Sequence, residues 1–319
     1  MIKNKQTIRD RALHAIGANR VPGLHFPGHF LNIRWSELSD DRAHLELDDG
    51  PHCRNATGAI DLTALAILID MALGTAARLQ IRPGARLGTV YLQVQFTGVA
   101  AKGDVTADAH FLGFSVGTML QRSLATTTLR AKDQVVCHAS GEFVPLDPPA
   151  GAILAPLPWQ LPRAGPIAPP NESVLTPHEC ATLRLCEDAI SSATPSVSFV
   201  QKLWGGAKAP TAVGAGRRIR VGPHLGNRVG HVQGGILLSI AASTACDAAP
   251  ATMALSSIAA WFVSPGRGKS LVARSRISHL GRSTAVVRTQ IKTSDRQLVL
   301  EAVTQHIGRA GRKTSTASY

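Results

Sequence analysis

The sequence repeats the same order of expected elements twice, and this internal duplication limits the fold more than any other feature. In each half, two expected strands come before one long apolar helix, and four strands follow it. In the first half these elements fall at residues 31–38, 42–48, 61–79, 89–96, 103–114, 118–131 and 134–144. In the second half they fall at residues 196–204, 215–221, 235–247, 253–265, 269–280, 283–293 and 297–307. A repeated unit of this size predicts two similar domains in one chain.

The expected strands alternate between apolar and polar residues with a period of two. In residues 89–96 the apolar side chains share one face, and these are Val90, Leu92, Val94 and Phe96. Such alternation is typical of a strand with one buried face. The helix at 61–79 is instead apolar on nearly all sides, so it needs cover on all sides. The sequence therefore predicts an α+β protein in which each half wraps an antiparallel sheet around a central helix.

A proline-rich segment separates the two halves. Ten of the nineteen prolines fall between Pro145 and Pro177, and proline removes backbone donors and restricts φ. We therefore expect a semi-rigid connector there. The predicted boundaries are a first domain at residues 20–145, a linker at 146–190, a second domain at 191–308 and a basic, disordered tail at 309–319.

Composition excludes several classes of protein. With 44% apolar and 17% charged residues the chain is expected to fold, and its net charge of +13 favours anionic ligands. Aromatic residues make up only 4%, which argues against binding of single-stranded nucleic acid. Asp61 and Asp70 interrupt the most apolar segment, so no membrane span is expected. Five cysteines without metal-ligand spacing, and a start without an export signal, predict a cytoplasmic protein with no metal site.

The turn before the second apolar helix carries the most specific local pattern. Residues 227–235 read NRVGHVQGG and lead straight into that helix. Glycines at a helix start let a ligand approach the backbone, and the unpaired N–H groups there can stabilise negative charge. The first half has a matching turn, in which Asn55 and Gly58 lie 172 residues before Asn227 and Gly230.

The pattern NRVGHVQGG, followed by a helix and then by WFVSPGRGKSLVARSRISHLGRSTAVV, resembles hotdog-fold thioesterases of the phenylacetate-pathway (PaaI-like) type. The resemblance is strong over residues 195–308. It is weaker over 20–145, where it rests on Asn55, Gly58, Asp70 and the order of the strands. It implies two tandem hotdog domains, paired as an intramolecular pseudo-dimer with active sites between the units.

The resemblance also implies which half supplies which part of the site. In the family a helix carboxylate lies nine residues beyond the His or Gln of the motif. Asp70 takes this place in the first half, whereas the second half has Ala242. The motif residues Gln233, Gly234 and Gly235 are kept in the second half only, and the first half has Asp61, Leu62 and Thr63. We therefore expect one complete site, shared between the halves, and one degenerate site.

The resemblance implies hydrolysis of acyl-CoA thioesters at the complete site. Asp70 would attack the thioester or deprotonate water, and these two routes stay open. The Gly234 N–H, with Gly235 beside it, and the Gln233 amide would stabilise the tetrahedral oxyanion. Asn227 would position Gln233 or the substrate carbonyl, and Thr89 would orient the attacking water.

Coenzyme A enters as part of the substrate, and no other cofactor is expected. Basic residues after the second helix would contact its phosphates, and these are Arg267, Lys269 and Arg282. The acyl group would lie between the two helices, against Ala66, Ile69, Leu73, Leu238 and Ala241. Association of two such chains into a homodimer through their sheet faces is compatible with this fold.

Two alternative functions stay open at this point. The degenerate second site would also suit a non-catalytic protein that binds acyl-CoA or fatty-acyl groups. A double-hotdog enoyl-CoA hydratase is the other alternative, although the chain lacks the Asp/His pair which that chemistry needs. Nucleic-acid binding would rest on charge alone and is not expected.

Overall fold

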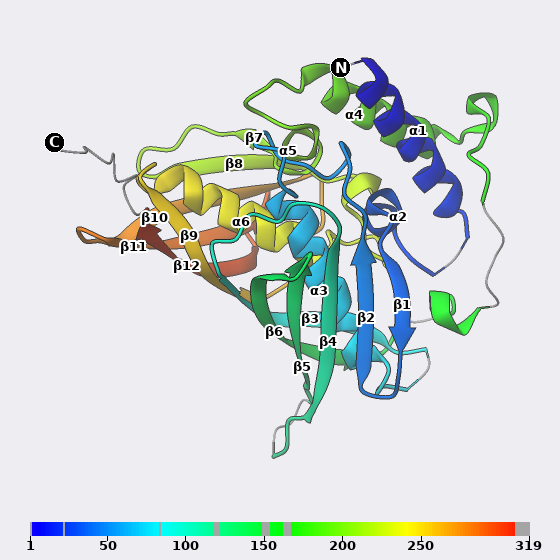
Figure 1. Ribbon diagram of the computed structural model, residues 1–319, viewed down its shortest axis with the longest axis horizontal. Helices are drawn as coiled ribbons and strands as arrows, with labels where there is room; N and C mark the ends of the chain where they lie inside the picture. Colours follow the sequence, from blue (N-terminus) through cyan, green and yellow to red (C-terminus); the bar gives the residue numbers. More distant parts are fainter. Residues whose placement is uncertain are drawn as a thin grey trace, which may run out of the picture.

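A single twelve-stranded antiparallel sheet runs through both halves of the protein (Figure 1). The computed structural model describes residues 2–21, 23–82, 84–117, 121–148, 154–161 and 167–309. The strands follow the order β1-β2-β4-β5-β6-β3-β9-β12-β11-β10-β8-β7. The six strands on each side of the β3–β9 contact come from one half of the chain, and their order on one side mirrors that on the other.

The first half wraps its strands around one long helix, α3 (Leu62–Arg78). Thirteen of the helix residues are buried, as its apolar sequence requires. The strands are β1 (Arg34–Leu38), β2 (Arg42–Leu47), β3 (Arg86–Phe96), β4 (Val105–Phe114), β5 (Ser123–Ala131) and β6 (Gln134–Leu146). Elements were expected at all of these places, with the helix bounds within one residue.

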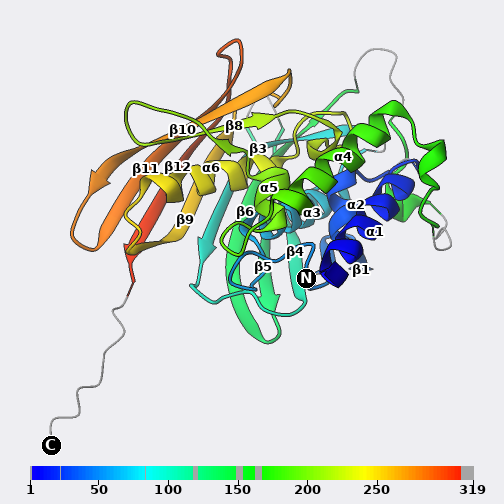
Figure 2. The same cartoon turned by 90° about the horizontal axis from the view of Figure 1, so that it is seen from above.

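The second half repeats the arrangement around α6 (Gly234–Ala248). Its strands are β7 (Ala207–Lys208), β8 (Ala215–Arg220), β9 (Met253–Phe262), β10 (Ser270–Leu280), β11 (Thr284–Thr293) and β12 (Leu298–Gly308). Both central helices lie on the same face of the sheet and pack against each other (Figures 1 and 2).

The two halves join edge to edge along β3 and β9. These strands pair antiparallel from Tyr91, opposite Trp261, to Gln95, opposite Ser257. The rings of Tyr91 and Trp261 also contact each other, with centroids 5.5 Å apart. Joining the sheets in this way satisfies two edge strands at once and brings the two central helices together.

One expected strand is wrong. Residues 196–204 were expected to be a strand, but they contain the helix α5 (Phe199–Trp204). Ser198 and Gln201 form a capping box at its start, with Ser198 Oγ accepting from the Gln201 N–H at 3.3 Å. This local capping outweighs the alternation of the sequence. The short helix α2 (Phe26–Leu31) lies at the equivalent place in the first half and is capped by His25.

The proline-rich linker does not run directly from one half to the other. It contains the short helices η1 (Pro158–Gln160) and η2 (Glu172–Val174) and leads into α4 (Pro177–Ser192). α4 packs along α1 (Ile2–Ala18), for which the sequence analysis predicted no element (Figure 2). Arg9 of α1 bonds to Glu172 at 2.7 Å and to Glu187 at 2.8 Å, which ties the linker to the N-terminus.

The domain boundaries themselves stay a prediction. Of the expected disordered tail, residues 310–319 lie outside the described part of the chain. Among the described helices, none is both long and apolar enough to span a bilayer.

Candidate active site

Asp70 lies at the wall of a cavity of about 370 Å³, on the side of α3 that faces β3 and the start of α6. Every neighbour of Asp70 on α3 from Thr63 to Leu73 is buried, whereas Asp70 itself is half-buried. A carboxylate on an otherwise apolar helix is costly unless it has hydrogen-bond partners, so its surroundings decide its role.

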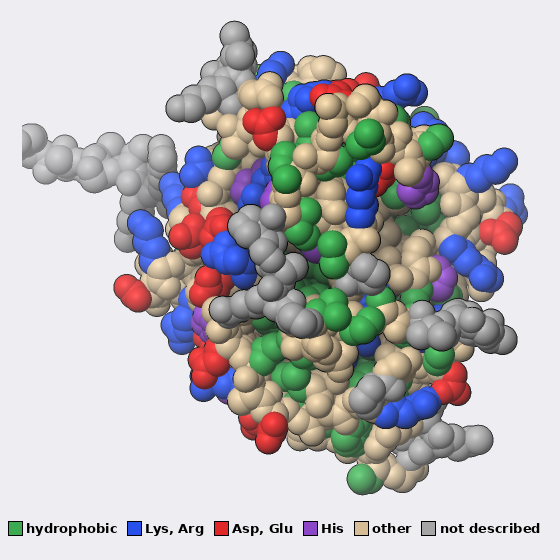
Figure 3. Space-filling view, turned by 90° about the vertical axis from the view of Figure 1, so that its right-hand side faces the viewer, with side chains coloured by type: hydrophobic (Ala, Val, Ile, Leu, Met, Phe, Trp, Pro, Cys, Tyr) green, Lys and Arg blue, Asp and Glu red, His purple; other side chains and the backbone are tan. Residues whose placement is uncertain are grey.

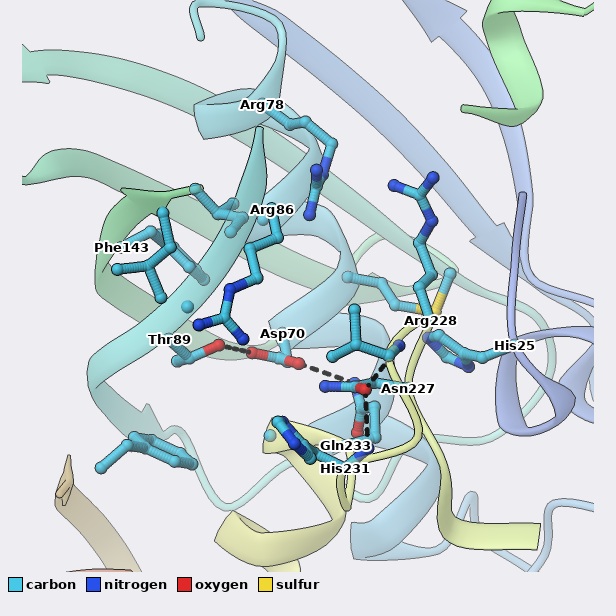
Figure 4. A pocket seen from close by; sticks show the side chains of 18 of the residues that line it. His25, Asp70, Arg78, Arg86, Thr89, Phe143, Asn227, Arg228, His231 and Gln233 are labelled. Atoms are coloured by element: carbon cyan, nitrogen blue, oxygen red, sulfur yellow. Dashed lines mark hydrogen bonds between the residues drawn. The ribbon is translucent and has the colours of Figure 1, made fainter. Parts of the chain in front are cut away.

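Two side chains from different halves of the protein hold the Asp70 carboxylate (Figure 4). Thr89 of β3 donates its hydroxyl to Asp70 Oδ1 at 3.0 Å. Gln233 donates its Nε2 to Asp70 Oδ2 at 2.7 Å. The oxygen of the same Gln233 amide accepts the Ile236 N–H at 3.0 Å and so caps α6. Because the amide oxygen is occupied by the cap, its NH₂ group faces the carboxylate.

Burial raises the pKa of Asp70 from 3.8 to about 6. The Thr89 hydroxyl, the Gly235 N–H and the positive charge of Arg78 each act in the opposite direction and favour the carboxylate. At neutral pH the group is therefore mostly ionised, and it is a stronger base than an exposed aspartate.

The start of α6 meets α3 at the two glycines. A Cβ on Gly234 would lie 2.8 Å from Asp70 Oδ1, and a Cβ on Gly235 would lie 2.2 Å from the Ala66 carbonyl oxygen. A larger residue at Gly235 would clash with backbone atoms of α3, whereas one at Gly234 would displace the Asp70 side chain. Within the described part of the chain, the N–H of Gly234 has no acceptor. A free N–H at a helix N-terminus, beside a carboxylate, can donate a hydrogen bond to the oxygen of a bound carbonyl group.

Asn227 shapes the turn, and among the described residues no hydrogen bond joins its side chain to Gln233 or Asp70. Its Oδ1 accepts the N–H groups of Val229 and His231, both at 3.0 Å. Asn55 does the same in the first half, accepting from Thr57 at 2.9 Å and Ala59 at 3.2 Å. We expected Asn227 to position Gln233 or a substrate carbonyl. In the structure its side chain instead fixes the turn that leads into Gln233.

The mirrored position between the halves lacks the groups that surround Asp70. Ala242 of α6 stands where Asp70 stands on α3. The register of β3 against β6 shifts between Thr89 and Tyr91, and the register of β9 against β12 shifts opposite Gln305 and His306. When these two shifts are aligned, Leu255 of β9 is the residue equivalent to Thr89 of β3. The mirrored position therefore has neither the carboxylate nor the hydroxyl.

The residues expected to bind substrate are only partly brought together. Arg267 is exposed and follows Gly266, which lines the cavity, and its charge acts on cavity-lining His231. Lys269 is exposed two residues further on. Arg282 lies beyond the opposite end of β10 and does not line the cavity.

The space between the two helices is closed, so the acyl group cannot lie there as expected. The side chains predicted to line it are all buried in the core, and these are Ala66, Ile69, Leu73, Leu238 and Ala241. The approach of Gly235 to Ala66 leaves no room at the crossing. The cavity runs instead beside α3, along Gly74, Leu87 and Phe143.

Several cavity residues were not predicted from the sequence. The basic ones among them are His25, Arg78, Arg86, Arg228 and His231 (Figure 4). Trp35 and Trp159 also line the cavity. Arg228 and His231 belong to the NRVGHVQGG motif, so their place in it was a usable signal. Trp159 comes from the linker and contacts Trp35, with ring centroids 5.5 Å apart. This contact joins distant segments, so no local sequence pattern predicts it. Seen from outside, apolar side chains gather at the centre of the α1 and β1 side and basic ones are spread around them (Figure 3).

No cluster of three or more His, Cys, Asp or Glu side chains in the described ranges is arranged to hold a metal ion.

Comparison with known families supports the relationship suggested by the motif. Residues 236–300 match the model of the thioesterase superfamily, which is about a fifth of the chain. No curated protein matches the sequence.

Solved structures share the architecture of nearly the whole chain. An "oleoyl thioesterase (putative)" from Lactobacillus plantarum covers 86% of this chain and 98% of its own, with 13% identity and a TM-score of 0.54. A "putative thioesterase" from Novosphingobium aromaticivorans does so with 14% identity and a TM-score of 0.53, again over 86% of this chain and 98% of its own. The tandem hotdog fold expected from the sequence is confirmed, whereas the PaaI-like subfamily stays a prediction.

Proposed function

We propose that this tandem hotdog-fold protein hydrolyses acyl-CoA thioesters at one site, built between its two halves. The observation that carries the proposal is the meeting of the Asp70 carboxylate with the glycine start of α6 at the wall of a cavity. Acyl transfer to water requires a base and N–H donors that can reach the same carbonyl group. Asp70 and the start of α6 would supply these two components.

The free N–H of Gly234 would bind the thioester carbonyl oxygen. In the tetrahedral intermediate this oxygen becomes negatively charged, and a preorganised donor of this kind contributes roughly 3–4 kcal/mol. The dipole of α6 points its positive end at the same place. The second hydrogen of the Gln233 amide nitrogen is the nearest additional donor, because the first is given to Asp70.

Asp70 would activate the water, or attack the carbonyl carbon itself. In the first route it takes a proton from water, the hydroxide adds to the carbonyl carbon, and the C–S bond breaks as the proton passes to the leaving sulfur. In the second route the carboxylate adds to the carbonyl carbon and the C–S bond breaks, which releases the thiolate of coenzyme A and leaves an anhydride on Asp70. Water hydrolyses the anhydride to the free acid and the Asp70 carboxylate, and the proton that is released goes to the thiolate. Either route yields the free acid and coenzyme A, and needs no oxidant or second substrate.

Release of thiol from a panel of acyl-CoA thioesters, followed colorimetrically, tests this function. Steady turnover of at least one thioester is expected. Binding of acyl-CoA without turnover of any thioester would favour a binding protein instead. We also propose a cytoplasmic location, since all five cysteines are free thiols. Whether two chains associate stays a prediction.

The pH dependence of hydrolysis follows from the pKa of Asp70. Because only the carboxylate can act as base or nucleophile, kcat/KM should be constant above pH 7 and fall about tenfold per pH unit below pH 6. The Thr89 hydroxyl lowers this pKa, so Thr89→Val should move the acidic limb to higher pH, by up to about one unit. A pH profile that is flat from 5 to 8 would separate Asp70 from the chemistry.

Gly234→Ala should lower kcat/KM by about a hundredfold while the protein still folds. The new methyl group would press on the Asp70 carboxylate, 2.8 Å away, and displace it from Gln233 and from the substrate. The fold should persist because the closest atoms belong to a side chain that can rotate. Rates and thermal unfolding curves would be measured together. Wild-type rates in a folded variant would place the reaction elsewhere.

A further inference from the structure

Three arginines line the cavity, and none of them forms an ion pair with a carboxylate in the described part of the chain. Arg86 lies at the Asp70 end, beside Thr89 (Figure 4), whereas Arg78 and Arg228 lie away from it. Arg78 donates to the backbone oxygen of Ala85 at 3.2 Å, and Arg228 donates to the backbone oxygen of Ala155. Neither forms an ion pair with an Asp or Glu in the described part of the chain. Both are half-buried, and burial lowers the pKa of each. The charge of Arg228 lowers the pKa of Arg78 further.

This arrangement differs from the other arginine sites of the protein. Arg9, Arg34, Arg54, Arg122 and Arg288, for example, each bond to at least one carboxylate. Two like charges brought together away from bulk water are costly unless an anion joins them. A second cavity, of about 410 Å³, adjoins them from the other side and has no acidic residue among its described lining residues. The protein therefore supplies two cationic groups, and the ligand has to supply the anion.

The position of Arg78 fixes where that anion would lie relative to the reaction. Asp70, Gly74 and Arg78 form the one half-buried stripe along the otherwise buried part of α3, each four residues after the last. Eight residues of helix span about 12 Å. Gly74 carries no side chain, so no side chain of α3 stands between Asp70 and Arg78 on this stripe.

The wall between the two charged ends is apolar. Leu87 and Phe143 lie beside Gly74, and Trp159 covers the same cavity from the linker. Asp70 is the single acidic residue among the described side chains that line this cavity. The passage has Asp70 and Arg86 near one end and the guanidinium groups of Arg78 and Arg228 near the other. It is complementary to an acyl chain that carries a carbonyl at one end and an anion at the other.

We propose that Arg78 and Arg228 bind a carboxylate at the far end of the acyl group, so that the protein's substrates are thioesters of dicarboxylic acids. This inference rests on the proposed thioesterase function. The phosphates of coenzyme A are the other anions in such a substrate, and the exposed Arg267 and Lys269 beside the cavity offer them a solvated site. The planar guanidinium groups of the half-buried pair suit a carboxylate, which accepts two parallel hydrogen bonds.

Paired substrates test the proposal. Adipyl-CoA and hexanoyl-CoA have acyl chains of equal length and differ in the terminal carboxylate, and the same two acyl groups would be offered as N-acetylcysteamine thioesters, which have no phosphate. The wild-type protein should prefer the adipyl over the hexanoyl group by at least about tenfold in kcat/KM in both series. Arg78→Gln and Arg228→Gln should each remove most of that ratio.

Arg82→Gln is the matched control, since Arg82 lines the second cavity only and pairs with exposed Asp147. It should keep the wild-type ratio. If Arg228→Gln is poorly folded, Arg228→Lys would be used instead. It should keep part of the adipyl-to-hexanoyl ratio, because the lysine ammonium keeps the positive charge but cannot form the two parallel hydrogen bonds of a guanidinium group.

Two kinetic results would overturn the proposal. One is a wild-type protein that handles both acyl groups alike in the N-acetylcysteamine series. The other is a pair of Gln variants that slow both CoA thioesters equally and leave both N-acetylcysteamine thioesters unaffected, since the arginines would then bind phosphate.

Calorimetry separates this proposal from the proposed function. If no thioester is hydrolysed, the thioesterase assignment fails, and the protein would be titrated with adipate and with adipamide, the uncharged diamide of the same length. Adipate binding that Arg228→Gln abolishes would still support a carboxylate site at these arginines. Equal binding of adipate and adipamide, or binding of neither, would overturn it.

Discussion

Asp70→Asn is expected to lower kcat/KM for every thioester that the protein hydrolyses by about 10³-fold. General-base catalysis contributes roughly 10²–10⁴-fold, and asparagine cannot accept the proton or form the anhydride. The loss should appear in kcat, because the asparagine oxygen can accept from Gln233 while its NH₂ group donates to the Thr89 hydroxyl, so the cavity keeps its shape. Thiol release measured under single-turnover conditions would report the chemical step directly. Equal rates for wild type and variant would remove Asp70 from catalysis.

The same substitution should not destabilise the fold. The pKa of Asp70 is raised from 3.8 to about 6, so the folded protein binds this proton more tightly than the unfolded chain does. The carboxylate therefore costs stability as the pH rises through this range, and the cost persists at pH 8. Asparagine has no such cost, so the melting temperature of the variant at pH 8 should equal or exceed that of the wild type. A clear drop would mean that lost activity reflects lost structure.

Asp61→Asn is the matched control for charge removal on α3. Asp61 is buried at the start of the helix, where its Oδ1 accepts the Thr63 N–H at 2.8 Å. Asparagine caps helices about as well as aspartate. Activity should stay within about twofold of the wild type, because Asp61 occupies the Gln233 place of the degenerate site and does not line the cavity.

Gly235→Ala should disrupt the packing of the two halves and lower the free energy of unfolding by ~3 kcal/mol or more. The added methyl group would lie 2.2 Å from the Ala66 carbonyl oxygen and 2.6 Å from the Ile67 nitrogen, and backbone atoms inside a helix cannot move aside singly. The two central helices would have to separate, which would also draw Asp70 away from α6. Denaturant unfolding would measure the loss, and unchanged stability would show that the helices do not cross this closely.

Gly74→Ala is the control for the intrinsic effect of alanine. Gly74 lies inside α3, and its added methyl group would meet Phe143 at 3.7 Å, an ordinary contact. Alanine stabilises a helix interior by about 1 kcal/mol relative to glycine. Gly74→Ala should therefore be neutral or stabilising, and the opposite result for Gly235→Ala would then be attributable to the helix crossing alone.

Much of the fold could be predicted from the sequence because it depends on local patterns. The alternation in residues 89–96 and the apolar run at 61–79 report which faces are buried, and burial dominates the choice of element. The expected strand at 196–204 is wrong because a capping box, which alternation does not detect, decided that segment. The helix α1 was not predicted because its apolar content is low. It is stabilised by its contacts with α4, which a local pattern does not report.

The sequence predicted which residues form the candidate site, but it did not predict most of the contacts between them. Asp70 and Gln233 were identified from matched positions in the two halves, and they are hydrogen-bonded to each other in the structure. The acyl site, however, does not lie between the helices, because the size of the gap depends on how close Gly235 comes to Ala66. The pairing of Arg78 with Arg228 joins residues 150 positions apart, and no spacing in the sequence reports it.

The sequence by itself determined the duplication, the apolar central helices, and the division by which one half keeps a carboxylate and the other keeps the glycines. These follow from composition and order along the chain, which act over a few residues at a time. Only the tertiary structure decided that the crossing of α3 and α6 is closed, that the linker covers a cavity beside α3, and that two arginines share its wall. Those features depend on distances between backbones that are fixed when distant segments pack, because close packing responds to the whole set of neighbours at once.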